Sequence, residues 1–377
     1  MIEPIEFENT LKTIKIGRGQ SVRDNIVFYG DDNLYPNTME SLVDGSQTAN
    51  ICVKTLADFL STPFKEEGMG DVVVGRTVTN KKYTLNQLKR DIAVSMAKFN
   101  GAYIAVTKNL KGETVSTSVL DFTKVRFSEF DDMGRSNYVY VGDWAGQIKG
   151  KTGRKHFLKL PLFNNNMEVF KKQSEGCRTT TQVYHVFASD EYVYPTNPFE
   201  SVAMDMDTEA SIQVTRHNEI TQGSPSKLVI RTDFSKNETV KQKQIEAIKK
   251  FAGPNGDKVL VIKSEFDEAG NPRSNNYQLD VINDTRDLSK FDSSEKSIAN
   301  NIRKCIQIPG ILIDFEFSSG ITVSGLQLKV SVSYFNDLIH AKRKMIEDSL
   351  KEIFENSSIN FPADDFRMTD FSMNYVE

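Results

Sequence analysis

The sequence predicts an α+β fold in which a small module is inserted between two helices. Three observations predict it. Two helix-like segments near the start are followed by many short apolar runs over 115–200. A β-α-β-β pattern over 224–283 lies between two segments whose apolar residues have helical spacing, and a long helix-like segment covers about 326–355. Helices and strands therefore occur largely in blocks, which is typical of the α+β class.

The N-terminal part is predicted to contain an irregular start and two helices. The first 36 residues look irregular. Apolar residues then recur at helical spacing over 46–60, and Ser46 is placed to cap this helix. Thr84 is placed to cap a second helix, which Gly101 is expected to end. These capping residues fix the helix boundaries more firmly than the apolar pattern alone.

The region after the second helix is predicted to be rich in strands. Valine, tyrosine and phenylalanine gather in short runs that Gly, Asp and Asn turns separate. The predicted strands, including the one directly after the second helix, are 102–106, 119–120, 125–127, 138–141, 158–163 and 183–187.

The second half is predicted to place the module between two helices of similar length. The first helix starts after Pro198 and runs to about Gln222, and the second covers roughly 284–306. In both, most acidic residues precede the basic ones, which suits the helix dipole. Within the module, strands are predicted at 228–230, 259–262 and 277–282, with a helix over 240–251.

The last part is predicted to form an ordered loop, a long helix and a short polar tail. The stretch 318–325 contains no charged residue and ends in Gly325. The helix 326–355 should turn one apolar stripe inward, and the tail 356–377 is polar and acidic with scattered Phe. The residues expected in the inward stripe are Phe335, Leu338, Ile339, Ile346, Leu350 and Ile353.

Composition and charge exclude several classes of protein. The chain has 47 basic and 51 acidic residues and a net charge of −4, which disfavours a protein that coats DNA by neutralising phosphates. The three cysteines and four histidines are scattered, so neither a disulfide scaffold nor a zinc site is expected, and no cofactor or metal is expected. No apolar run approaches about 20 residues, so we expect no membrane span. The first residues do not resemble a signal peptide.

One segment resembles a phosphate-binding loop. Residues 145–152, Ala-Gly-Gln-Ile-Lys-Gly-Lys-Thr, fit a relaxed Walker A pattern with Ala in place of the first Gly. A phosphate loop needs a helix directly after it, and 153–161 does not read as a helix. A strand-to-strand loop is favoured, and a phosphate-handling enzyme stays open as the alternative. The loop is also basic, through Lys149, Lys151, Arg154, Lys155 and Lys159.

The remaining candidate motifs favour no catalysis. The segment 253–258, Gly-Pro-Asn-Gly-Asp-Lys, is expected to end a helix and turn into a strand. The carboxylate pairs Asp131-Asp132 and Asp364-Asp365 have no neighbouring His, so a metal site is not predicted at either. The sequence therefore predicts a protein that is not an enzyme.

The order of the predicted elements carries a resemblance that no single motif carries. In chain order, the segments that contribute to it are Leu60-Ser-Thr-Pro-Phe64, Lys98-Phe-Asn-Gly-Ala-Tyr-Ile-Ala-Val106, Val119-Leu-Asp-Phe-Thr-Lys-Val-Arg126, Val183-Tyr-His-Val-Phe187, Asn197-Pro-Phe199, Gly223-Ser-Pro-Ser-Lys-Leu-Val-Ile230, Lys249-Lys-Phe-Ala-Gly-Pro-Asn-Gly-Asp-Lys-Val-Leu-Val-Ile262 and Ile306-Gln-Ile-Pro309. Over 45–355 their order and spacing resemble those of the portal proteins of tailed bacteriophages, of the long-tailed-phage type.

The resemblance implies a portal-like division of the chain. The expected parts are an α/β wing at 1–199, a first stem helix at 200–223, a β-α-β-β clip at 224–283, a second stem helix at 284–310, a tunnel loop at 311–325, and a long wing or crown helix with a short acidic tail at 326–377. So few residues after the last helix leave little room for a crown domain.

The resemblance also implies a function and partners. Portal subunits form a homo-oligomeric ring, usually of twelve copies, at one vertex of the capsid in the virion. The ring is the channel for packaging and ejection of double-stranded DNA. It docks the terminase large subunit and head–tail adaptor proteins and contacts the major capsid protein, with no membrane involved, and it is assembled in the host cytoplasm. Another non-catalytic virion connector ring is a further alternative, beside the phosphate-handling enzyme.

Three groups of site residues follow from this resemblance and from the charge pattern. The tunnel loop in the DNA channel is expected to comprise Ser318, Ser319, Gly320, Ile321, Thr322, Val323 and Ser324. Weak contacts of the stem with DNA are expected from Lys290, Lys296, Arg303 and Lys304. Contacts of the clip with terminase or adaptor are expected from Lys227, Arg231, Lys263 and Arg273.

Overall fold

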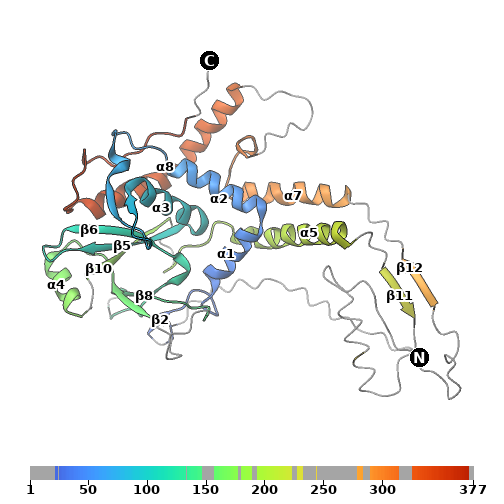
Figure 1. Ribbon diagram of the computed structural model, residues 1–377, viewed down its shortest axis with the longest axis horizontal. Helices are drawn as coiled ribbons and strands as arrows, with labels where there is room; N and C mark the ends of the chain where they lie inside the picture. The colour runs from blue at the N-terminus through green and yellow to red at the C-terminus, as the bar shows by residue number, and fades with distance from the viewer. Residues whose placement is uncertain are drawn as a thin grey trace. The chain divides into compact units, whose positions relative to one another are not determined.

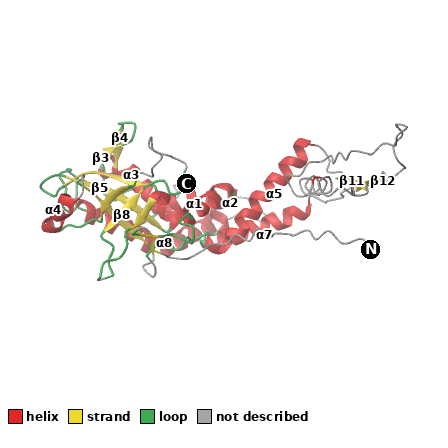
Figure 2. Ribbon diagram, turned by 90° about the horizontal axis from the view of Figure 1, so that it is seen from below, coloured by secondary structure: helices red, strands yellow, loops and turns green. Residues whose placement is uncertain are grey.

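The computed structural model describes residues 22–23, 25–132, 134–146, 157–176, 180–188, 193–222, 227–231, 243, 278–282, 289–313 and 325–372 (Figure 1). The chain divides into two compact units. The large unit contains the residues up to Met206 and those from Asn300 onward, and the small unit contains Asp207–Ala299. The mixture of helices and antiparallel sheets agrees with the predicted α+β class (Figure 2).

The elements have the following bounds. The helices are α1 (Tyr35–Gly45), α2 (Gln47–Leu60), α3 (Leu85–Phe99), α4 (Met167–Gly176), α5 (Ala203–Gln222), α7 (Ser289–Cys305) and α8 (Gly325–Phe354). The strands are β1 (Val22–Arg23), β2 (Ile26–Val27), β3 (Val73–Arg76), β4 (Lys82–Thr84), β5 (Gly101–Lys108), β6 (Thr114–Leu120), β7 (Val125–Phe127), β8 (Tyr138–Val141), β9 (Leu158–Pro161), β10 (Thr181–Phe187), β11 (Lys227–Arg231) and β12 (Gln278–Ile282).

Helix α3 and strand β5 form the centre of the large unit. Thr84 caps α3 in a capping box with Gln87, and Asn100 at its other end takes a left-handed conformation with a φ of 61°. Strand β5 starts at Gly101 and pairs antiparallel with β10 on one side and β6 on the other. A Cβ on Gly101 would lie 2.7 Å from Phe187 Cδ1, so this position favours glycine because of close packing. The helix therefore ends where it was predicted to end, but Asn100, and not Gly101, takes the left-handed conformation that ends it.

A cluster of aromatic rings and one buried arginine hold the second sheet, β7-β8-β9, to the segment that leads into α1. The Tyr29 ring stacks on Tyr194 and on Tyr35, with ring centroids 4.2 and 4.8 Å apart. Arg126 is fully buried and donates to the side-chain and backbone oxygens of Asn33 at 2.6 and 2.7 Å. Because an unpaired buried charge is costly, these bonds fix Asn33 and the start of α1 in place.

The segment after α8 packs into the large unit. The Lys65 backbone N–H donates to the Arg367 carbonyl at 2.9 Å, and that of Thr369 donates to the Pro63 carbonyl at 2.8 Å. The rings of Phe59 and Phe371 stack with centroids 4.1 Å apart. The acidic tail expected from the sequence thus contributes to the core over its described part.

Among the described elements, the strand pairs β1–β2 and β3–β4 and the helices α1 and α4 were not predicted. Helix α4 lies in the region predicted to be all strands, where its polar sequence, MEVFKKQSEG, shows only a weak apolar pattern. Helix α1 begins at Tyr35, inside the start that was predicted to be irregular. Pro36 occupies the first turn of α1, where proline is tolerated because its nitrogen needs no partner there.

The small unit contains most of α5 and α7 and the strand pair β11–β12. The strands pair antiparallel, with Lys227 opposite Ile282 and Arg231 opposite Gln278. The predicted strands 228–230 and 277–282 are thus confirmed. Of the predicted helix 240–251 only Lys243 is described, and the predicted strand 259–262 lies outside the described residues.

Candidate functional site

The four basic residues expected to face DNA all lie on α7. At about 100° per residue, Lys296 and Arg303 share one side of the helix, and Lys290 and Lys304 lie on the neighbouring side. The buried residues Ile298 and Ile302 lie on the other side of the same helix. Lys296 and Lys304 are exposed and Arg303 is half-buried. The sequence thus gives α7 an apolar side, while its basic residues lie on other sides of the helix, where Asp292 is a neighbour of Lys296.

The ends of α5 and α7 meet within the large unit. Cys305, the last residue of α7, donates its thiol to the Pro198 carbonyl at 2.8 Å, and its sulfur lies 3.3 Å from the Ser201 hydroxyl. The Tyr35 hydroxyl donates to the Glu200 carboxylate at 2.7 Å just before α5 begins. The segment before α5 therefore bonds both to the end of α7, through Cys305, and to the start of α1, through Tyr35.

Within the small unit, an ion pair joins α5 to α7, which run in opposite directions (Figure 1). Arg216 on α5 pairs with Glu295 on α7 at 2.8 Å. Both side chains are about 30% exposed (31% and 28%), so the pair contributes modestly to stability. Its geometric effect is to set the register of the two helices.

The other predicted site residues are only partly described. Lys227 and Arg231 occupy the first and last positions of β11. Lys263 and Arg273 lie outside the described residues, as does the expected tunnel loop, Ser318 to Ser324. The chain on either side of that loop is described up to Ile313 and from Gly325.

The Walker-like segment lies between two paired strands. Strand β8 ends at Val141 and pairs antiparallel with β9, which begins at Leu158. A phosphate loop of the Walker type instead leads from a strand into a helix of a parallel crossover. Residues 147–152 lie outside the described part, but the pairing of the flanking strands disfavours the phosphate-handling alternative.

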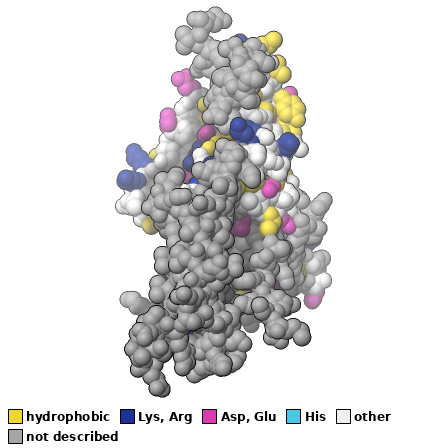
Figure 3. Space-filling view, turned by 90° about the vertical axis from the view of Figure 1, so that its right-hand side faces the viewer, with side chains coloured by type: hydrophobic (Ala, Val, Ile, Leu, Met, Phe, Trp, Pro, Cys, Tyr) yellow, Lys and Arg dark blue, Asp and Glu magenta, His cyan; other side chains and the backbone are white. Residues whose placement is uncertain are grey.

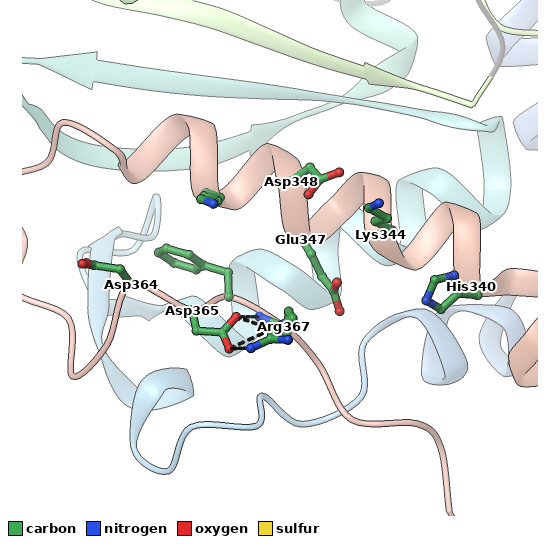
Figure 4. Close-up of a pocket in the computed structure, with 9 residues that line it drawn as sticks. His340, Lys344, Glu347, Asp348, Asp364, Asp365 and Arg367 are labelled. Atoms are coloured by element: carbon green, nitrogen blue, oxygen red, sulfur yellow. Dashed lines mark hydrogen bonds and ion pairs between the residues drawn. The ribbon is translucent and has the colours of Figure 1, made fainter.

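A charged groove of about 650 Å³ lies between α8 and the C-terminal segment (Figure 4). We call it the C-terminal groove; its lining residues are His340, Lys344, Glu347, Asp348, Lys351, Asp364, Asp365, Phe366 and Arg367. Arg367 pairs with Asp365 at 2.6 Å, and this hydrogen-bonded pair lowers the pKa of the Asp365 carboxyl. Glu347 accepts from the Met368 backbone N–H at 2.7 Å. Because three basic and four acidic side chains line it, the groove is a polar surface of nearly balanced charge.

The described part of the chain offers no metal site. Within the described ranges, no three His, Cys, Asp or Glu side chains gather closely enough to hold a metal ion. None of the helices in the described part of the chain is long and apolar enough to cross a membrane.

The sequence reasoning missed a row of exposed apolar residues on the first half of α8. Leu338 was expected to point inward, but it is 39% exposed, whereas Phe335 and Ile339 beside it are buried. Leu326, Val330 and Tyr334 are exposed by 70%, 60% and 56%. We call these four residues the α8 stripe. Their spacing of four residues, outside the row that forms the core, was the signal that could have revealed the stripe.

Comparison with solved structures finds similar proteins, whereas the sequence comparisons find none. No protein-family model matches the chain, and no curated protein matches it. A chain in the virion of a native gene transfer agent particle matches with a TM-score of 0.52 and 10% identity, covering 89% of this chain and 83% of that one. A chain in the neck of the native particle, computed with C12 symmetry, matches with a TM-score of 0.51 and 12% identity, covering 87% and 82%.

A phage portal protein of the HK97 family from Corynebacterium diphtheriae also matches, with a TM-score of 0.41 and 8% identity, covering 84% of this chain and 90% of that one. With TM-scores of 0.52 and 0.51 at 10% and 12% identity, the two particle chains establish a shared fold and nothing beyond it.

Proposed function

We propose that this chain is the subunit of a portal-type ring at the head–tail junction of a phage or phage-like particle. The observation that carries the proposal is the shared fold with chains from a particle's virion and neck, over more than four-fifths of both chains. The C12 symmetry used for the neck supports a ring of twelve copies. A closed ring of one chain needs only a repeated heterologous contact.

The charge distribution supports a conduit for double-stranded DNA that does not grip it. The net charge of −4 avoids the strong phosphate binding that would slow sliding DNA. The basic residues of α7 would supply weak contacts along the channel, through Lys296, Arg303 and their neighbours. The tunnel loop, Ser318 to Ser324, contains no Lys or Arg and would contact DNA through its shape and polarity.

The clip would bind the packaging and tail machinery. Lys227 and Arg231 on β11, with Lys263 and Arg273, would contact the terminase large subunit during packaging and adaptor proteins afterwards. The wing would contact the major capsid protein. In this proposal the ring belongs to the virion, is assembled in the host cytoplasm, and performs no catalysis of its own because the motor ATPase is a separate protein.

Negative-stain electron microscopy of the purified full chain tests the ring. We expect turbine-shaped rings with an axial hole, and monomers under every condition would contradict the proposal.

An ATPase assay of the unsubstituted chain and of Lys151→Ala distinguishes the portal proposal from the enzyme alternative. Turnover that is lost on this substitution would favour a phosphate-handling enzyme.

The tunnel loop has its own test. Removing part of Ser318 to Ser324 should still permit ring assembly but should impair packaging, because the loop would be the narrowest contact with DNA. The measurement is the fraction of DNA-filled heads, and a normal fraction would refute the role given to the loop.

A further inference from the structure

The α8 stripe gives the first half of this helix two apolar sides. The inner side consists of Val332, Phe335 and Ile339, all buried in the large unit. On the opposite side, the stripe residues recur every four positions from Leu326 to Leu338, over roughly 18 Å of helix. Figure 3 shows hydrophobic side chains gathered at the upper edge of the face, at the height where α8 begins in Figure 1. A helix that is apolar on both sides is normally covered on both.

The size of the stripe fits the centre of a protein–protein interface. Four side chains with these exposures present on the order of 400 Å², within the range of about 300–600 Å² for the largest apolar patch on a typical monomer. A stable interface buries about 800 Å² on each partner, so the stripe would supply its apolar core.

The charge around the stripe disfavours nucleic acid as the occupant. From Gly325 to Ala341 only Lys329 and Asp337 carry a full charge. DNA backbone contacts need several cations, and one lysine beside one aspartate provides no net positive charge. Interfaces between copies of one chain, in contrast, are depleted of charge at their centre.

A groove of about 320 Å³ lies on another side of the same half-helix. Val332, Ser333 and Asn336 of α8 line it together with Phe371 from the C-terminal segment. Lys329, Asp337 and Asp370 also line it, and Asp370 pairs with Arg343, so an apolar surface such as the stripe would meet no strong field of one sign there. At 100° per residue the groove positions lie about 120° around the helix from the stripe. A heterologous ring contact needs two such different surfaces on each copy.

We propose that the α8 stripe packs against a second copy of this chain and forms the apolar core of the contact between neighbours. The stripe of one copy then fits against the groove side of α8 in the next. This inference rests on the proposed ring and names the surface that closes it.

The test compares two double variants of the full chain. Leu326→Glu with Val330→Glu introduces two carboxylates into the stripe. Leu110→Glu with Val78→Glu makes the same changes at exposed positions elsewhere, where Leu110 is 87% exposed and Val78 is fully exposed. Glutamate is a good helix former and suits the first turns of a helix, so α8 itself should be retained. Light scattering over a concentration series gives the concentration at which half of the chains are assembled.

We expect the unsubstituted chain and the control variant to assemble alike. The stripe variant should need at least about 100-fold more protein for half assembly, because burying unpaired carboxylates is costly. Rings that form equally well in the stripe variant would overturn this surface while leaving the proposed function intact. An unsubstituted chain that is monomeric at every concentration would overturn both. A stripe variant whose monomer has a lower urea midpoint than the control would show that the chain's own residues cover the stripe, which also overturns the inference.

Discussion

The two halves of α8 share one helix but present different faces to their surroundings. In the first half the exposed large hydrophobic side chains are those of the stripe. In the second half the exposed positions are His340, Ala341, Lys344, Asp348, Lys351 and Glu352, of which four are charged. The inner rows of both halves are equally apolar, with Phe335 and Ile339 in one and Ile346 and Leu350 in the other.

This difference teaches which apolar residues stabilise the folded chain and which are available to a partner. The second half behaves as an ordinary amphipathic helix, whose charged face water covers. The first half has no comparable charged face over its described residues, where only Lys329 and Asp337 carry a full charge. Variants on the buried row of α8 should therefore affect folding, and variants on the stripe should affect assembly. The two kinds of variant on one helix can be compared directly.

The largest effect is expected in the core of the second half. Leu350 is fully buried, so Leu350→Ala should lower the free energy of unfolding by about 2–5 kcal/mol through lost burial and the cavity left behind. The matched change Leu338→Ala, at a side chain that is 39% exposed, should cost clearly less. Urea unfolding of both variants measures this, and equal losses would mean that Leu338 is also a core residue.

A smaller loss is expected at Arg343, which joins the two halves. Its guanidinium donates to the Phe59 carbonyl at 2.9 Å, to Asn336 at 2.8 Å and to Asp370 at 2.6 Å. Arg343→Leu should cost about 2 kcal/mol because it leaves the buried carbonyl without its donor. Asp370→Asn should cost under about 1 kcal/mol, since the Asp370 side chain is 75% exposed. A larger loss from Asp370→Asn than from Arg343→Leu would reverse this assignment.

The pH dependence of stability should separate two lysines of the second half. Burial lowers the pKa of Lys342, which donates to Asn100 Oδ1 at 2.8 Å, whereas Lys344 is exposed. Between the lowered pKa and the ordinary one, the unfolded chain binds more protons, so the free energy of unfolding rises with pH.

Lys342→Met should reduce this rise of the free energy of unfolding with pH, and Lys344→Met, at an exposed position, is the matched control. Burial also lowers the pKa of Lys89 and of Lys108 to about 8 each, so part of the rise will remain in both variants. Urea unfolding between about pH 7 and pH 10 provides the measurement. Identical slopes in both variants would show that Lys342 stays charged.

The smallest effect on folding is expected on the stripe itself. Leu326→Ser with Val330→Ser should change the free energy of unfolding of the monomer by no more than about 0.5 kcal/mol per site, as surface changes usually do. Dilute protein in urea keeps the measurement free of assembly. A loss comparable to that of Leu350→Ala would show that the stripe belongs to the core.

Local signals in the sequence predicted many of the elements. Ser46 caps α2 by accepting from the Ala49 N–H at 3.1 Å, and Thr84 forms the predicted cap of α3. Strand β8 has the predicted bounds, and α8 starts and ends within one residue of the prediction. Helix α4 was missed because its polar composition hides the pattern on which the prediction depends.

The candidate site was predicted less completely. The basic residues of α7 were identified from their charge alone, and among them Lys296, Arg303 and Lys304 lie on other sides of the helix than the buried Ile298 and Ile302. The C-terminal groove was not foreseen because it joins α8 to a segment that the sequence suggested to be a tail. Asp365 and Arg367 are only two residues apart, so their ion pair gives no information about which distant helix lies beside them.

By itself the sequence determined where several helices and strands begin and end, because caps, turns and apolar spacing act within a few residues. It also determined the near-neutral charge and the order of elements that points to a portal-type fold. Tertiary structure decided which of the apolar rows on α8 is the core and which is exposed. Both rows have helical spacing, so only contacts with residues distant in sequence, such as the edge-on contact of Phe335 with Phe59, distinguish them.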